Sequence, residues 1–287
     1  MPKSAGSFDP RQELKAESFE IQHKRDTYLK KVALHHHDFY EIYYLVSGDV
    51  TYQIEGRLYH VLPGDLLLIS PRELHQVSIA EKNEPYERYV LWLPISEAQR
   101  LSCTECDLER GLDASQPRYT NLLHPDGELR QVIRWCMETL YQESESKQYG
   151  AGMLSESCLR QLMVFIGRLQ ETQIDYPREE LELVHSVVEY LTLHYSEKIT
   201  LDQLAAQFFV SKFHLCHEFQ RYVGTSIHQY LQKKRLQIAK EMLRTGVSAS
   251  SVSIRVGFGD YAGFYRAFRS EYGISPREFS GIWRKET

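Results

Sequence analysis

The sequence predicts an α+β protein with a β-rich N-terminal domain, a helical connector and an all-α C-terminal domain that carries two helix-turn-helix units. Three observations predict this order. Short apolar runs separated by turn residues occupy residues 30–93, helical periodicity replaces them from Asp126, and one cap-and-core pattern occurs twice after residue 200. The expected domains are residues 1–120, 121–175 and 176–287.

The composition is that of an ordinary soluble protein. The chain has 287 residues, of which 42% are apolar and 25% are charged, so it can bury two cores and has no signature of disorder. Its first 18 residues are polar, and apolar runs such as Leu66–Ile69 are of strand length. We therefore expect neither a secretory signal nor a membrane span, and we expect a cytoplasmic protein.

The N-terminal domain reads as many short strands. Runs rich in Tyr, Val, Ile and Leu lie at residues 40–46, 50–54, 66–69 and 89–93. The turn signals between them are Ser47-Gly48-Asp49, Glu55-Gly56-Arg57, Pro63-Gly64-Asp65 and Ser70-Pro71. Short strands at close spacing predict a closed or sandwich-like β structure, which removes free sheet edges.

Two amphipathic helices are expected in the connector. Apolar residues fall at helical spacing from Leu129 to Leu140 and again from Leu154 to Leu169, with a polar break between them. These helices either pack on the β domain alone or also form a dimer contact. We expect a homodimer, because twofold oligomers are common.

The first helix-turn-helix unit is predicted at Thr200–Gly224. Leu204 and Ala205 form one face of a short helix, and Ser211 is a good N-cap for a second helix that ends at Gly224. The buried face of that second helix is expected to carry Leu215 and Phe219. A short helix, a tight turn and an N-capped helix are the pattern in which the second helix enters the major groove of DNA.

The same pattern returns at Ser248–Gly273. Asp260 corresponds to Ser211 as N-cap, and Phe264 and Phe268 correspond to the apolar pair four and eight residues after the cap. Gly273 closes the helix as Gly224 does. Residues 227–243 between the units read as one long helix, which would fix the distance between two recognition helices.

The C-terminal third resembles the AraC/XylS family of bacterial regulators. The resemblance rests on Arg235, Ala239 and Leu243, on Val256-Gly257-Phe258, and on the run from Phe264 to Phe279 with its closing Gly-x-Ser-Pro-x-x-Phe. Two positions depart from the family pattern. Ser253 replaces the usual Ala, and Phe209-Val210 stands where a small residue is common.

The residues expected to meet DNA lie near the starts of the two second helices. They are Lys212, Phe213, Cys216 and His217 in the first unit, and Tyr261, Ala262, Tyr265 and Arg266 in the second. Arg266 can hold guanine through two hydrogen bonds, and His217 can donate to a base acceptor. Lys212, Arg221 and Arg269 are expected at phosphates. From Tyr176 onward the chain has 15 basic and 12 acidic residues, and the remainder has 19 and 27, so only the C-terminal part favours DNA.

A cluster of histidines marks the β domain. His35, His37 and Glu41 share strand parity, so an unbroken strand would direct them to one face, and His75 follows in a second strand-rich segment. His36 has the opposite parity and is expected in solvent. The spacing His-x-His-x3-Glu-x6-Gly resembles the first motif of the cupin superfamily, and residues 71–75 resemble its second motif without the usual Gly. The resemblance implies a cupin-like barrel that senses a small effector, often a sugar.

Three interpretations of the cluster stay open. His35, His37, Glu41 and His75 either hydrogen-bond a polar effector, with Tyr43 and Trp92 as stacking surfaces for a sugar ring, or bind a divalent metal, or satisfy one another inside the barrel. We expect no bound cofactor. Cys103 and Cys106 form a single C-x-x-C pair without the second pair of a structural zinc site, and all five cysteines are expected as free thiols.

The sequence thus predicts a dimeric, ligand-responsive regulator of transcription and not an enzyme. Its partners would be double-stranded DNA, a small effector of carbohydrate type and, if it is an activator, RNA polymerase. Two alternatives remain. One is a metal-dependent cupin enzyme fused to a DNA-binding domain, and the other is a regulator whose barrel only dimerises.

Overall fold

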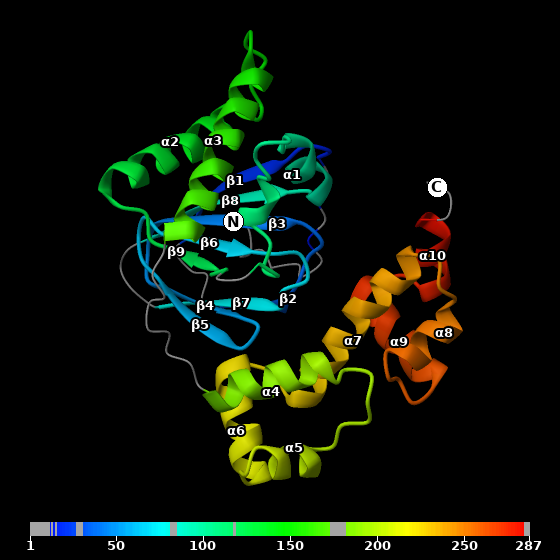
Figure 1. Ribbon diagram of the computed structural model, residues 1–287. Helices are drawn as coiled ribbons and strands as arrows, with labels where there is room; N and C mark the ends of the chain where they lie inside the picture. The colour runs from blue at the N-terminus through cyan, green and yellow to red at the C-terminus, as the bar shows by residue number, and fades with distance from the viewer. Residues whose placement is uncertain are drawn as a thin grey trace, which may run out of the picture. The chain divides into compact units, whose positions relative to one another are not determined.

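The computed structural model describes residues 12, 14, 16–26, 31–80, 85–116, 119–172 and 182–283. The chain forms two compact units, residues 1–54 with 58–179 and residues 55–57 with 180–287. We call them the β unit and the helical unit. The β unit contains two sheets with helices on one side, and residues 182–283 of the helical unit contain helices as their only regular elements (Figure 1). The predicted fold class is confirmed.

The β unit has a five-stranded and a four-stranded sheet, which lie face to face (Figure 1). In spatial order, the larger sheet contains β1 (Glu20–Asp26), β8 (Tyr86–Leu93), β3 (Tyr40–Ser47), β6 (Leu66–Ile69) and β9 (Leu122–Leu123). The smaller contains β2 (Lys31–His35), β7 (His75–Ile79), β4 (Val50–Ile54) and β5 (Arg57–Val61). The predicted strands at 50–54 and 66–69 are confirmed to the residue. β1 lies outside the region that was predicted as β.

Strand β3 is buried on both faces, and its alternation separates two cores. Ile42 and Tyr44 belong to the core under the helices, whereas Tyr43 and Leu45 belong to the core between the two sheets. Glu41 shares the parity of Tyr43, so it also faces the space between the sheets. A carboxylate in an apolar interior needs partners, because its desolvation is costly.

Four helical segments accompany the sheets: α1 (Ile95–Leu101), the 3-10 turn η1 (Glu109–Gly111), α2 (Gly127–Glu143) and α3 (Ala151–Thr172). Asp126 caps α2 by accepting a hydrogen bond from the backbone N–H of Leu129 at 2.9 Å. Ile133 of α2 and Leu162 of α3 share one buried core with Ile42 of β3. The two predicted connector helices therefore pack on the β domain, as both interpretations required.

The helical unit begins with α4 (Glu182–Leu193) and ends with α10 (Pro276–Trp283). Between them lie α5 (Leu201–Gln207), α6 (Lys212–Val223), α7 (Ile227–Arg244), α8 (Ala249–Arg255) and α9 (Tyr261–Tyr272). Among the described residues, no helix combines the length and the apolar character that crossing a membrane requires.

Candidate functional site

The first helix-turn-helix unit consists of α5 and α6. Thr200 begins α5 with a capping box, in which its hydroxyl accepts from the N–H of Gln203 and the Gln203 side chain accepts from the N–H of Thr200. Ser211 caps α6 by accepting from the N–H of His214, and Gly224 ends it with a φ of 69°. The predicted caps of this unit are confirmed.

The second unit consists of α8 and α9 and repeats the first. Asp260 caps α9 by accepting from the N–H of Gly263, and Gly273 ends it with a φ of 78°. Phe264 and Phe268 are fully buried in one core with Val252 of α8. Their burial confirms the prediction that this pair belongs to the core, so only the other faces of α9 are available to a ligand.

The turn of the second unit is one residue longer than that of the first, and it has a glycine at the position that Phe209 occupies in the first. In the first, the N–H of Phe209 donates to Ala206 and that of Val210 to Ala205; in the second, Gly257 and Phe258 make the equivalent bonds to Ile254 and Ser253. Phe209 therefore occupies the position of Gly257. Both are left-handed, with φ of 55° and 82°. The second turn contains one extra residue, Gly259, between this position and its N-cap. The two N-caps are therefore one residue further apart in the sequence than the two first helices are.

Helix α7 joins the two helix-turn-helix units and also binds the loop that precedes α5. Arg235 of α7 donates to the carbonyl oxygens of Tyr195 and Glu197, each at 2.7 Å. Its guanidinium thus serves a structural purpose. Lys233 is paired with Glu271 of α9 at 2.7 Å. These contacts tie α7 to the start of the first unit and to the recognition helix of the second.

Most of the side chains predicted to meet DNA are exposed. The exposed ones are Lys212, Phe213, His217 and Arg221 on α6, and Tyr261, Ala262, Arg266 and Arg269 on α9; Cys216 and Tyr265 are half-buried. On α6, the rings of Phe213 and His217 stack with centroids 6.0 Å apart. Arg266 is exposed and has no hydrogen bond or ion pair with the part of the chain that the structure describes, so its guanidinium can meet a ligand without first breaking an internal bond.

The histidine cluster lies between the two sheets, although the strand that was expected to align it is broken. β2 ends at His35 and β3 begins only at Tyr40, so strand parity does not extend across the segment. His35, His37, Glu41 and His75 are nevertheless all buried. His36 is buried as well, and the expectation that it faces solvent is wrong because the broken strand removes the alternation on which it rested.

The backbone fixes which nitrogen of each imidazole carries the proton. The Nδ1 atoms of His35, His37 and His75 lie 2.8 Å from the carbonyl oxygens of Ala33, Phe39 and Glu73. A carbonyl only accepts, so each Nδ1 donates its hydrogen, and in a neutral ring Nε2 then carries the lone pair. The Nε2 atoms of His37 and His75 are buried without a hydrogen-bond partner among the described residues.

Glu41 completes the group. Its Oε2 accepts from the indole N–H of Trp92 at 2.8 Å and lies 3.5 Å from Nε2 of His37. Ligand atoms of His37, Glu41 and His75 lie within 4.8 Å of one another, and His35 is outside this group although its ring centroid is 4.1 Å from that of His75. The structure thus brings together three of the four predicted metal ligands.

The charge states follow from the surroundings. Burial raises the pKa of Glu41, but the close approach and charge of His37, the charge of His35 and the hydrogen bond from Trp92 outweigh it and hold that pKa below its usual range. Burial and the neighbouring His35 and His37 keep the pKa of His75 well below its usual range. The site therefore presents a carboxylate and a neutral imidazole, which suits a cation or a hydroxyl-rich ligand.

The two predicted stacking surfaces are inside the same space. Tyr43 is fully buried, its hydroxyl donates to that of Tyr86 at 3.1 Å, and its ring meets Tyr52 edge to face. Trp92 lies against Phe39 with ring centroids 5.0 Å apart. Both rings therefore already contact other aromatic side chains.

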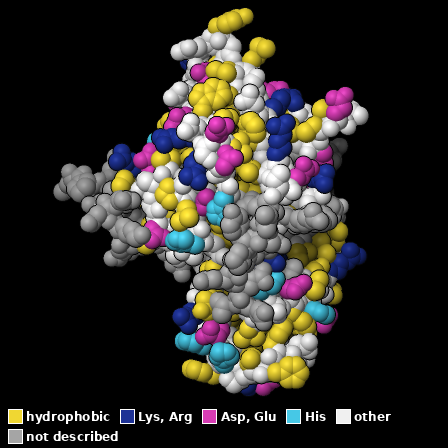
Figure 2. Space-filling view, turned by 60° about the vertical axis from the view of Figure 1, so that its left-hand side comes forward, with side chains coloured by type: hydrophobic (Ala, Val, Ile, Leu, Met, Phe, Trp, Pro, Cys, Tyr) yellow, Lys and Arg dark blue, Asp and Glu magenta, His cyan; other side chains and the backbone are white. Residues whose placement is uncertain are grey.

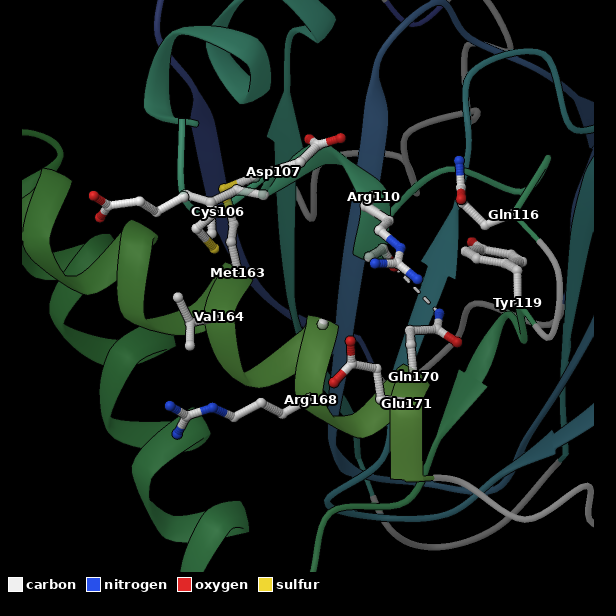
Figure 3. Close-up of a pocket in the computed structure, with 14 residues that line it drawn as sticks. Cys106, Asp107, Arg110, Gln116, Tyr119, Met163, Val164, Arg168, Gln170 and Glu171 are labelled. Atoms are coloured by element: carbon white, nitrogen blue, oxygen red, sulfur yellow. Dashed lines mark hydrogen bonds between the residues drawn. The ribbon is translucent and has the colours of Figure 1, made fainter. Parts of the chain in front are cut away.

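A cavity of about 530 Å³ lies elsewhere in the β unit, between the α1–η1 segment and α3 (Figure 3). Cys106, Arg110, Tyr119, Gln170 and Glu171 are among its lining residues, and none of the six predicted effector residues is. Sequence reasoning missed this cavity because its two walls come from segments about 60 residues apart that carry no shared motif.

Comparison with known proteins covers both units. The AraC-like ligand binding domain matches residues 18–163, and a helix-turn-helix domain matches residues 204–281. The HTH-type transcriptional activator RhaS of Enterobacter sp. (strain 638) is 24% identical over 245 residues, which cover 85% of this chain and 86% of that protein. RhaS of Escherichia coli (strain K12 / DH10B) is 24% identical over 247 residues with the same coverage. The structure of ToxT from Vibrio cholerae has a TM-score of 0.42 and 12% identity, and covers 93% of this chain and 99% of that one.

Proposed function

The chain belongs to the AraC family of DNA-binding transcription regulators with a ligand-binding domain, and we propose that it is an activator whose effector is a carbohydrate bound between the two sheets. The observation that carries the regulatory function is the pair of capped recognition helices, each with exposed polar side chains, on one framework held by α7. We assign residues 1–120 to effector binding, 121–175 to the connector and 176–287 to DNA binding. The proposed role is regulatory and not catalytic.

Arg266 and His217 are the proposed readers of base edges. Both are exposed near the start of a recognition helix, which is the part that lies deepest in the major groove. Lys212, Arg221 and Arg269 are proposed phosphate contacts. The remaining interface residues are Phe213, Cys216, Tyr261, Ala262 and Tyr265. Because the partner is DNA, we place the protein in the cytoplasm.

The proposed effector site comprises His35, His37, Glu41, Tyr43, His75 and Trp92. Sugars present many hydroxyl groups and an apolar ring face, and they are bound by carboxylates, imidazoles and aromatic rings. The polar groups come from Glu41 and from the Nε2 atoms of His37 and His75, neither of which has a hydrogen bond in the part of the chain that the structure describes, and Tyr43 and Trp92 supply the rings. Binding changes DNA occupancy only if the sugar prefers one arrangement of the protein over another.

A thermal-shift screen against a panel of monosaccharides tests this site. A sugar at 100 times its Kd adds about 2.7 kcal/mol to the native state, which raises Tm by roughly 5–10 °C for a domain of this size. Glu41→Gln keeps an oxygen for the Trp92 indole but removes the charge, and it should abolish the shift. His60→Ala, on an exposed side chain of β5, should leave it unchanged. A panel without any response, or an equal response of Glu41→Gln, would refute the proposal.

The same group supports a second candidate, a divalent metal site. Nδ1 bonds to backbone carbonyls orient metal-binding histidines in many proteins, and three buried rings here show this pattern. Donor atoms on a tetrahedral zinc ion lie about 3.4 Å apart. The ligand atoms of His37, Glu41 and His75 lie within 4.8 Å of one another, so they have to move closer together to bind zinc. The alternative of a metal-dependent enzyme requires a metal at this place.

Metal loading separates the two candidates. If His37, Glu41 and His75 bind zinc, protein incubated with zinc chloride and then desalted should retain one ion per chain by mass spectrometry. His37→Ala and His75→Ala should each lose it, and His60→Ala should retain it. Wild-type protein that emerges free of zinc rules out the metal site and leaves the effector proposal intact.

We also propose that α2 and α3 form a homodimer contact. Large apolar side chains are exposed on these helices and on the turn that joins them, including Trp135 of α2 at 50%, Tyr149 of the turn at 107% and Met153 of α3 at 80%, and hydrophobic side chains gather over this part of the β unit (Figure 2). Trp135→Asp should therefore shift the mass by light scattering from dimer to monomer. Leu62→Asp, at an equally exposed position outside these helices, is the matched control. RNA polymerase is the further partner expected of an activator.

A further inference from the structure

Cys103 and Cys106 face each other across a two-residue turn in the segment between α1 and η1. The N–H of Cys103 donates to the carbonyl of Cys106 at 2.9 Å, and the N–H of Cys106 donates back at 3.1 Å. The two residues thus form an isolated antiparallel bridge, with Thr104 and Glu105 as the turn. Both cysteines are free and exposed.

This geometry places two thiols within reach of one another. In a hydrogen-bonded antiparallel pair the Cα atoms are about 5.5 Å apart and the side chains leave the same face. Disulfides span Cα separations of about 4.4–6.8 Å. The Cβ atoms of a disulfide are about 3.8 Å apart, whereas the Cβ atoms of directly opposed residues on neighbouring strands are about 4.5–5.5 Å apart. A bond would therefore draw the turn in by about 1 Å, and an exposed turn can accept this.

The other cysteines differ in ways that matter for oxidation. Cys136 and Cys158 are buried between α2 and α3, and burial raises the pKa of the Cys136 thiol to about 12 and that of Cys158 in the same direction. A protonated, buried thiol is a poor nucleophile. Cys216 is half-buried on α6. Only Cys103 and Cys106 are both exposed and opposed.

We propose that Cys103 and Cys106 form a reversible disulfide by exchange with a small disulfide such as oxidised glutathione. One thiolate attacks a sulfur of oxidised glutathione and releases one glutathione as thiolate, which leaves a mixed disulfide on the protein. The second cysteine attacks that protein sulfur and releases the second glutathione. The two protein thiols are oxidised to one disulfide, and oxidised glutathione is reduced to two thiols. The exposure and the required contraction of the turn both favour a bond that is easily reduced.

The proposed disulfide acts on the wall of the 530 Å³ cavity. Cys106, Asp107 and Leu108 line one side of it, and Met163 and Val164 of α3 line the other (Figure 3). The N–H of Leu108 is held by the hydroxyl of Ser102, which precedes the turn. At the far end Gly111 and Gly167 touch closely, since a Cβ on Gly111 would lie 3.0 Å from Gly167 backbone atoms. The turn is therefore the side of the cavity that oxidation can move.

Equilibration of the full chain in glutathione buffers of graded ratio, followed by acid quenching, alkylation and peptide mass mapping, tests the proposal. Oxidising buffers should remove two alkylatable thiols, at Cys103 and Cys106 together, and dithiothreitol should restore both. Cys103→Ser should instead retain glutathione on Cys106, and Cys216→Ser should lose the same two alkylatable thiols, at Cys103 and Cys106, in oxidising buffers.

Three results would overturn the proposal. One is a wild-type protein in which both cysteines stay alkylatable across the whole series. The other is a wild-type protein that accumulates glutathione on either cysteine without losing it to the second, which would show that the turn does not close. A disulfide mapped to Cys136 and Cys158 in place of this pair would equally exclude it.

Discussion

Replacing Gly257 with alanine is expected to destabilise the helical unit by about 3 kcal/mol or more. Gly257 has a φ of 82°, where a residue with a Cβ is strained. The added Cβ would also lie 2.5 Å from the carbonyl oxygen of Ser196. That oxygen belongs to the loop whose neighbouring carbonyls Arg235 binds, so the loop is held from two sides and cannot yield freely.

Two matched variants separate the causes of this effect. Gly246 has a φ of 84° with nothing within 4 Å of an added Cβ, so Gly246→Ala incurs backbone strain alone, about 1–2 kcal/mol. Phe209 occupies the position of Gly257 in the first turn and is 95% exposed, so Phe209→Gly relieves strain and should stabilise the unit slightly. Thermal unfolding followed by circular dichroism measures all three. Equal losses for the variants at Gly257 and Gly246 would show that the contact with Ser196 costs nothing.

The helix-turn-helix units were predictable because their determinants are local. Ser211 and Asp260 each bond an N–H three residues ahead, and Phe264 and Phe268 follow from helical spacing, so one short window of sequence contains the cap and the core. The equivalence of Phe209 and Gly257 was harder to predict from the sequence than the caps and core residues were. The extra Gly259 shifts the second cap by one residue, and the shared hydrogen-bond pattern reveals the alignment only in the structure.

The β unit was predictable in kind but not in detail. His37 and Glu41 meet as predicted, but the break between β2 and β3 means that strand parity is not the cause, and the same break makes the prediction for His36 fail. The Nδ1 bonds to Ala33, Phe39 and Glu73 depend on the backbone path near each histidine, which spacing alone does not specify. The cavity depends on packing between distant segments, so no local pattern announces it.

Replacing Arg266 with alanine is expected to weaken binding to the specific DNA site by about 5–150-fold, which corresponds to about 1–3 kcal/mol. Arg266 is exposed on the recognition helix α9, and its planar guanidinium can donate two parallel hydrogen bonds to O6 and N7 of guanine. Arg266→Lys keeps the charge but not the fork, so it should lose most of the specificity while retaining binding to random sequence.

Anisotropy titrations on a promoter fragment and on random duplex DNA, each over a range of salt concentrations, distinguish base reading from charge attraction. Arg266→Ala should lose affinity for the promoter alone and leave the salt slope nearly unchanged. Lys212→Ala, at an exposed residue that pairs with Asp202 at 2.8 Å, should weaken both DNAs and lower the slope by about 0.9 as one phosphate contact is lost. If Arg266→Ala weakened both DNAs equally, the side chain would contact the backbone, and the assignment of α9 as a base-reading helix would have to rest on other residues.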